Sequence, residues 1–103
     1  MSAPDEATTN ADDIIDNFMR GHQFLSTELG IEDPNISWQL DSFGVSKGYA
    51  RLARDIGFDA MFFSRIDAEE KLKLQKNKEK VQVWRADETN FGPKKDILSI
   101  VMA

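Results

Sequence analysis

Asp41 and Arg65 are the two residues whose types and positions could do chemistry together. Each directly follows a stretch with the pattern of a β-strand, over residues 36–40 and 60–64. Ligands of open α/β sheets bind beyond the carboxyl ends of the strands, and adjacent strands lie roughly 4.8 Å apart, so the two side chains could approach closely. A neighbouring guanidinium would favour the ionised carboxylate, which is the form required of a nucleophile or a metal ligand.

Structural roles compete with this interpretation at each candidate position. An aspartate after a strand is more often a turn or capping residue, and an isolated arginine more often forms a surface ion pair. Phe43 and Trp84 are typical core residues, although Phe43 could offer a ring face to a sugar and the Trp84-Arg85 pair also follows a strand pattern. His22 lies on the apolar stripe of a helix pattern, which favours a packed, hydrogen-bonded histidine over a ligand.

An alternation of helix and strand patterns is expected to position these residues. Periodicity predicts helices over about residues 11–29, 47–56 and 68–78, and strands over residues 36–40, 60–63, 81–84 and 97–102. The residues able to cap the three helix starts are Thr8, Thr9 or Asn10, then Ser46, then Asp67 with Glu70. This order predicts an α/β fold with a parallel β-sheet and crossover helices. Since the chain stops after an apolar strand with no helix to cover it, we also predict an incomplete piece of a larger α/β catalytic domain.

Composition limits the classes of function. The 103 residues carry a net charge of -5, which argues against a nucleic-acid or anionic-membrane partner because phosphate binding needs a basic surface. The absence of cysteine excludes disulfides and thiolate metal sites, and the single histidine cannot complete a multi-histidine metal site within this chain. No apolar run is long enough to span a membrane, and the first residues carry no apolar signal segment. A neutral ligand such as a sugar is compatible with this negative net charge.

Residues 38–46 resemble a known catalytic motif. Their sequence, Trp-Gln-Leu-Asp-Ser-Phe-Gly-Val-Ser, is similar to the nucleophile motif of the class II α-mannosidases of glycoside hydrolase family 38, usually Trp-x-Ile-Asp-Pro-Phe-Gly-His-Ser. Further similarities to that family follow in order at residues 5–7, 21–25, 57–67 and 83–85. Because five segments match in register, the resemblance is specific, and it is strongest to the lysosomal branch.

The resemblance implies a zinc-dependent retaining α-mannosidase that hydrolyses terminal α-mannosides of N-glycan-type oligosaccharides in the lysosome or secretory pathway. By position, Asp41 would be the catalytic nucleophile and a zinc ligand, Phe43 would line the sugar subsite, and Arg65 would help hold the nucleophile and substrate. Retention fits a carboxylate nucleophile paired with a second carboxyl group that acts as acid and base. The zinc ion would orient sugar hydroxyls and help distort the ring.

The chain also departs from the family pattern. Ser42 stands where the family usually has proline, and Val45 where it has histidine. The family's other zinc ligands and its acid/base aspartate match no residue here, so we predict that residues 1–103 are a partial α-mannosidase-like catalytic domain, inactive alone. One alternative is a non-catalytic carbohydrate-binding or interaction relative that kept the scaffold. Another is a phosphate- or nucleotide-binding module, which the absence of a glycine-rich strand-to-helix loop disfavours.

Overall fold

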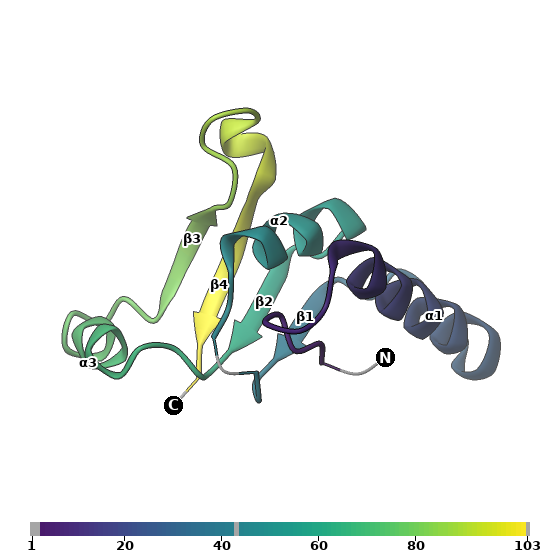
Figure 1. Cartoon of the computed structure of the whole chain (residues 1–103), viewed down its shortest axis with the longest axis horizontal. Helices are drawn as coiled ribbons and strands as arrows, with labels where there is room; N and C mark the ends of the chain where they lie inside the picture. Colours follow the sequence, from purple (N-terminus) through teal and green to yellow (C-terminus); the bar gives the residue numbers. More distant parts are fainter. Residues whose placement is uncertain (1–2, 43, 103) are drawn as a thin grey trace.

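The computed structural model describes residues 3–42 and 44–102, which form a small mixed α/β fold (Figure 1). In chain order the elements are α1 (Ala11–Leu29), β1 (Ile36–Gln39), α2 (Lys47–Ile56), β2 (Ala60–Phe63), α3 (Ala68–Lys76), β3 (Val81–Arg85), the 3-10 helix η1 (Gly92–Lys95) and β4 (Asp96–Val101). The predicted helices and strands are all present, and their bounds differ from the predictions by at most a few residues. Among the described residues, no helix is both long enough and apolar enough to cross a membrane.

Local capping bonds explain why the helices begin where the sequence predicted. The side chain of Asn10 accepts a hydrogen bond from the Asp13 amide at 2.9 Å, which selects Asn10 from the three predicted caps of α1. Ser46 accepts from the Tyr49 amide at 3.0 Å at the start of α2. Gly30 ends α1 with a φ of 67°, a conformation that glycine adopts without steric cost. Each of these signals acts over three or four residues, which is why sequence reasoning could find them.

The four strands form one sheet in the order β1-β2-β4-β3, and three of them are parallel. Gln39 pairs with Phe63 at the end of β1 and β2, so the two strands finish at the same edge of the sheet. The prediction of an all-parallel sheet is wrong for β3, which runs antiparallel to β4. The connection between them, residues 86–95, contains only the short η1, whereas a parallel return needs about a dozen residues or more, usually with a full helix.

The core lies between the sheet and the two helices α1 and α2, which cross its near face in Figure 1. Phe18 of α1 packs edge-on against Phe58 with ring centroids 5.3 Å apart, and Met61 and Ile97 present the sheet side of this core. The Tyr49 hydroxyl of α2 lies 2.9 Å from Ser37 Oγ on β1. Burial of this phenol raises its pKa to about 12, so Tyr49 stays neutral at physiological pH.

The opposite face of the sheet is apolar and open to solvent in this chain. Trp38 of β1 is 58% exposed and Val83 of β3 is 64% exposed, and the Trp38 ring lies 5.5 Å from that of Phe62. Ala60–Phe63 is a continuous apolar run, the pattern typical of a strand covered on both faces, but the described residues bury only alternate side chains of β2. Parallel strands in proteins are buried on both faces, so this surface is an unusual one to leave in water.

Candidate active site at the carboxyl ends of the parallel strands

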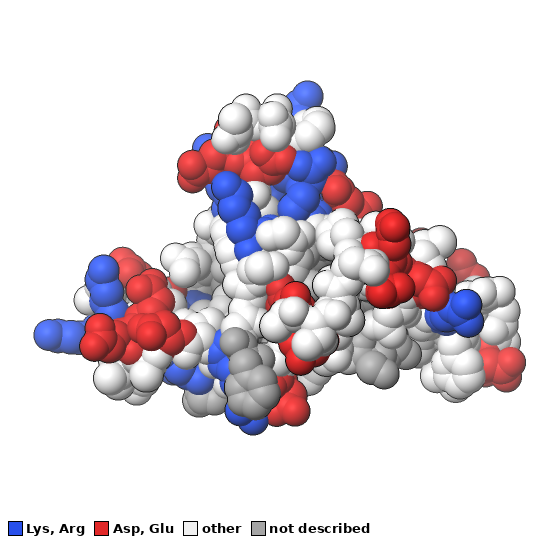
Figure 2. Space-filling view, viewed as in Figure 1, with Lys and Arg blue, Asp and Glu red and all other residues white. Residues whose placement is uncertain are grey.

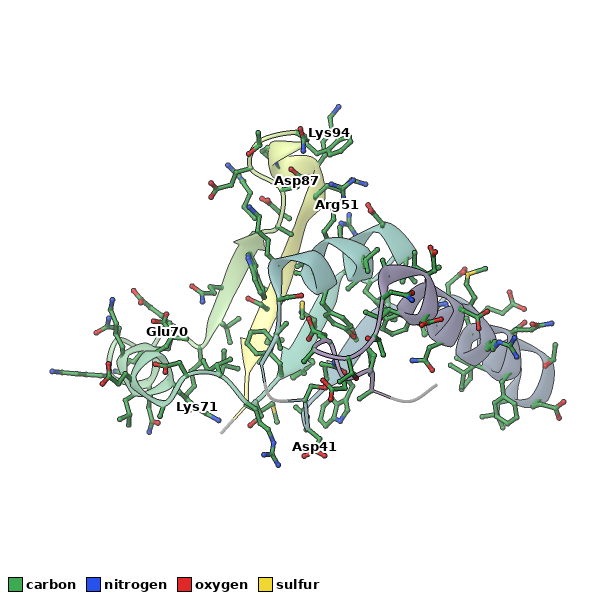
Figure 3. All side chains as sticks on the ribbon, viewed as in Figure 1. Asp41, Arg51, Glu70, Lys71, Asp87 and Lys94 are labelled. Atoms are coloured by element: carbon green, nitrogen blue, oxygen red, sulfur yellow. The ribbon has the colours of Figure 1, made fainter. Side chains whose placement is uncertain are left out.

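Asp41 and Arg65 lie together at the edge where β1 and β2 end. Arg65 Nη2 donates a hydrogen bond to Asp41 Oδ1 at 2.8 Å, and the two residues each stand two positions beyond the last paired residues of their strands. The Asp41 side chain is 89% exposed and that of Arg65 is 49% exposed. Figure 3 shows Asp41 projecting from the lower end of the sheet into solvent. The predicted juxtaposition of the carboxylate and the guanidinium is therefore confirmed, while the catalytic roles are not tested by the geometry.

Two hollows flank the loop that follows Asp41, and they share Gly44. One, of about 370 Å³, lies on the side of the N-terminal segment and is lined by Asp5, Glu6, Ala7, Ser42, Gly44, Val45 and Ser46. The other, of about 470 Å³, lies on the side of α3 and is lined by Gly44, Ser64, Arg65, Ile66, Asp67, Ala68 and Lys71. Both hollows are lined by polar as well as apolar groups, so hydrogen-bonding ligands could occupy the space beside the Asp41–Arg65 pair.

The N-terminal segment is fastened to this same loop, which sequence reasoning did not foresee. The Pro4 carbonyl accepts a hydrogen bond from Gln39 Nε2 at 2.8 Å and another from Ser42 Oγ at 2.9 Å. Glu6 Oε1 accepts from the Ser46 amide at 2.8 Å and from Ser46 Oγ at 2.5 Å. Residues 5–7 were noticed only as a match to the family, because no local pattern links residue 6 to residue 46.

The remaining candidates are placed away from the pair or cannot be placed. Phe43, predicted to line the sugar subsite, falls outside the described residues. His22 packs edge-on against Phe58 with ring centroids 5.5 Å apart, which fits a packed histidine. Its Nε2 is buried and has no hydrogen-bond partner in the described part of the chain.

Trp84 and Arg85 lie at the other end of the sheet from Asp41. The prediction that they follow a strand at the catalytic edge is wrong, because β3 is antiparallel and Arg85 pairs with Asp96 at the start of β4. Hydrogen bonding and charge attraction from Asp96 raise the pKa of Arg85. Trp84 is partly buried against the core, with its ring 6.2 Å from that of Phe63. Trp84 and Arg85 therefore contact the core and Asp96, and they do not lie beside Asp41.

The described residues do not make a complete metal site around Asp41. Across residues 3–42 and 44–102, no three histidine, aspartate or glutamate side chains are grouped so that they could hold a metal ion. A zinc site needs three or four protein ligands, and Asp41 offers a single carboxylate. The described residues around Asp41 therefore do not supply a full set of zinc ligands.

A second cluster of charges, which the sequence did not reveal, joins α2 to the loop between β3 and β4. Arg51 of α2 donates to Asp55 Oδ2 at 2.9 Å and to Asp87 Oδ2, and Lys95 Nζ lies 2.6 Å from Asp55 Oδ1. The Arg51 guanidinium also lies over the ring of Phe91, 4.5 Å from its centroid. Partial burial would raise the pKa of Asp55, but the hydrogen bonds from Lys95 and Arg51 outweigh it and lower that pKa.

The charged surface around these sites is mixed in sign. On the face drawn in Figure 2, acidic and basic side chains are interspersed over α3 and over the loop between β3 and β4. The labelled Arg51 and Asp87 in Figure 3 belong to the upper of these regions, at the far end of the sheet from Asp41. The two Arg–Asp sites are therefore separated by the length of the strands.

Comparison with known proteins identifies relatives of the whole chain. The family model for the N-terminal domain of glycosyl hydrolases family 38 matches residues 1–103. The lysosomal alpha-mannosidase of Cavia porcellus is 37% identical over 99 residues, which are 95% of this chain and 10% of that protein. Alpha-mannosidases of Arabidopsis thaliana and Canavalia ensiformis are each 39% identical, over 86% and 92% of this chain. These matches confirm the predicted resemblance, and the chain spans about a tenth of the length of the curated relatives.

Proposed function

Because this chain belongs to glycosyl hydrolase family 38, we propose that it forms part of the catalytic domain of an α-mannosidase. The proposed substrates are terminal α-mannosides of N-glycan-type oligosaccharides, and the proposed compartment is the lysosome or secretory pathway, as the names of several relatives suggest. The observation that carries the proposal is the contact between Arg65 and the exposed Asp41 at the carboxyl ends of two adjacent parallel strands. This is the edge at which open α/β sheets bind their ligands.

Asp41 is proposed to be the nucleophile of a retaining hydrolysis. Its carboxylate would attack the anomeric carbon of the mannoside and form a covalent mannosyl-enzyme, while the leaving oxygen takes a proton from a second carboxyl group. Water would then cleave this ester, with the second carboxyl group acting as base. No residue of this chain is assigned to the acid/base role. Arg65 would fix the direction of Asp41 Oδ2 by holding Oδ1.

A zinc ion is proposed to share the Asp41 carboxylate, with its remaining ligands supplied by polypeptide outside this chain. When bound, it would orient sugar hydroxyls next to the nucleophile. Because the acid/base group and these ligands are not assigned within residues 1–103, we expect the chain alone to neither bind zinc tightly nor hydrolyse mannosides. Turnover of an aryl α-mannoside by the purified 103-residue chain would contradict this expectation.

The substitution Asp41→Asn in the full-length polypeptide tests the proposed function. An amide cannot act as an anionic nucleophile, so kcat should fall by about a thousandfold or more. Asp59→Asn is a matched control, because Asp59 is also exposed and also accepts a hydrogen bond from an arginine, Arg54, at 3.0 Å. The control should keep kcat within about twofold, as expected for a surface substitution away from the site.

A covalent label distinguishes the enzyme from a non-catalytic relative. A fluorinated mannoside that traps the glycosyl-enzyme should add its mass to the peptide that contains Asp41, and Asp41→Asn should abolish the label. Oligosaccharide binding by the full-length protein without turnover or labelling would instead favour the non-catalytic relative. Val45 gives that alternative its structural support, because it packs against the core where the family pattern has a polar histidine.

A further inference from the structure

One buried carbonyl accepts hydrogen bonds from side chains on both sides of Asp41. Gln39, two residues before Asp41, and Ser42, directly after it, both donate to the Pro4 carbonyl, at 2.8 and 2.9 Å. Gln39 is completely buried and Pro4 is buried as well, so water does not compete for this carbonyl as it would at the surface. Two donors that bracket residue 41 and share one acceptor fix the path of the chain through that residue.

The far end of the loop is held by a carboxylate from the same N-terminal segment. Glu6 Oε1 accepts from both the amide and the hydroxyl of Ser46, at 2.8 and 2.5 Å. Ser46 also caps α2 by accepting from the Tyr49 amide, so the loop is tied to Glu6 and to a rigid helix at the same residue. A carboxylate at a helix N-terminus is in addition favoured by the helix dipole.

Two atoms of this arrangement remain unsatisfied, which a purely stabilising contact would not explain. Glu6 Oε2 and Gln39 Oε1 are buried with no hydrogen-bond partner in the part of the chain that the structure describes. A buried polar atom without a partner costs about 1–3 kcal/mol. The two side chains keep their bonds to Pro4 and Ser46 in spite of this cost.

The side chain of Asp41 needs such support because it is largely exposed in the described part of the chain. It is 89% exposed, and the Arg65 guanidinium that contacts it is itself 49% exposed. An exposed carboxylate keeps a productive direction only if its backbone is fixed, and a misplacement of about 1 Å at a reacting group can cost about a hundredfold in rate.

We propose that Ser42 and Glu6 are positioning residues for Asp41, and that together with Pro4, Gln39 and Ser46 they form a clamp that holds the nucleophile loop against the N-terminal segment. This inference rests on the proposed function of Asp41. It adds that the reaction depends on residues 4–6, which lie more than thirty positions earlier in the sequence than Asp41. The clamp acts through the side chains of Gln39 and Ser42 and through the amide and hydroxyl of Ser46, and it donates no group to the reaction.

The test uses the full-length polypeptide and pairs each loss with a conservative variant. Ser42→Ala and Glu6→Ala should each lower kcat on an aryl α-mannoside by about tenfold, with KM within about twofold, because the reacting carboxylate is misplaced while the sugar contacts remain. Ser42→Thr keeps the hydroxyl and Glu6→Gln keeps an acceptor oxygen, so both should recover most of the lost kcat. The rate of covalent labelling by the fluorinated mannoside should follow kcat in each variant.

Ser26→Ala is the matched control for loss of a serine hydrogen bond. Ser26 Oγ donates to Glu32 Oε1 at 3.2 Å on the outside of α1, so its removal should leave kcat and labelling unchanged. If Ser42→Ala does not fold, the Glu6→Ala and Glu6→Gln pair carries the same test through the other end of the loop.

The outcomes separate the clamp from the proposed function. If Asp41→Asn abolishes turnover but Ser42→Ala and Glu6→Ala keep normal kcat and labelling rates, the clamp is wrong and the nucleophile assignment stands. If kcat falls in Ser42→Ala and Glu6→Ala but neither Ser42→Thr nor Glu6→Gln restores it, the contacts serve folding alone and the clamp is wrong. The same conclusion follows if Ser26→Ala lowers kcat by an equal factor. If Asp41→Asn keeps full activity, the proposed function fails, and the clamp fails with it.

Discussion

The two ends of the sheet each carry an arginine–aspartate pair, and the two pairs differ in burial and in support. At the end where β1 and β2 finish, the Asp41 and Arg65 side chains are 89% and 49% exposed. At the other end, the Asp87 and Arg51 side chains are only 12% and 29% exposed. An exposed pair contributes little to stability because water and salt screen it, whereas breaking a buried pair leaves a charge without compensation. The same two residue types therefore serve the fold at one end and are available for chemistry at the other.

The supporting contacts sharpen this difference. Arg51 is held by Asp55, by Asp87 and by the face of Phe91, and Asp87 Oδ1 also accepts from the Asn90 amide at 3.0 Å. These contacts close the β3–β4 loop onto α2. At the Asp41 end, Ser42 Oγ bonds the Pro4 carbonyl and the Ser46 amide bonds Glu6, and these contacts leave the Asp41 carboxylate itself exposed. The Arg51–Asp87 pair is thus held by several bonds to its own side chains, whereas the bonds around Asp41, apart from that to Arg65, are made by its neighbours in the chain.

The largest expected effect is on stability at the buried end. Asp87→Ala removes the partner of the partly buried Arg51 and the cap of the following turn, so the free energy of unfolding should fall by about 2 kcal/mol. Asp41→Ala removes an exposed partner and should change it by less than about 0.5 kcal/mol. Urea denaturation of both variants and the wild type measures the difference. Equal losses at the two ends would contradict the contrast drawn between them.

A smaller effect is expected from Arg51→Lys, which keeps the charge but loses the planar guanidinium. A lysine cannot bridge Asp55 and Asp87 while lying over the Phe91 ring, so the melting temperature should fall by an amount equivalent to about 1 kcal/mol. The matched substitution Arg65→Lys at the exposed end should leave the melting temperature unchanged. It should lower kcat of the full-length polypeptide, because a single ammonium holds Asp41 less rigidly. A melting temperature lowered as much by Arg65→Lys as by Arg51→Lys would contradict the expected difference between the two ends of the sheet.

The smallest expected effect is the pH dependence that Asp55 adds to the buried end. Its pKa is lowered in the folded protein, net of burial, by hydrogen bonds from Lys95 and Arg51. A carboxyl group with a lowered folded pKa stabilises the protein above its ordinary pKa of about 4 and loses that contribution as the pH falls through the folded value. The difference in melting temperature between wild type and Asp55→Asn should thus be present at pH 7 and shrink below about pH 4. A difference that is constant from pH 7 to pH 3 would contradict it.

Sequence reasoning was accurate where one short stretch of chain carries the signal, and it failed where two distant stretches meet. The caps at Asn10 and Ser46 and the apolar run at Ala60–Phe63 were readable because each acts within a few residues. The direction of β3 could not be predicted from the sequence, because its residues have the same apolar pattern whichever way the strand runs. That error moved Trp84 and Arg85 to the wrong end of the sheet. The contacts of Pro4 and Glu6 were missed because their partners lie thirty-five to forty positions away.

By itself, the sequence determined which family this chain belongs to, where its helices and strands lie, and that a carboxylate and a guanidinium each follow a strand. Only the tertiary structure decided that Asp41 and Arg65 contact each other, that the Arg51–Asp87 pair is partly buried at the opposite end, and that the N-terminal segment is bonded to Ser42 and Ser46 beyond Asp41. The physical reason is that caps and periodicity are set by neighbours along the chain. Burial and charge pairing, in contrast, depend on which surfaces meet when the sheet forms and the helices pack on it.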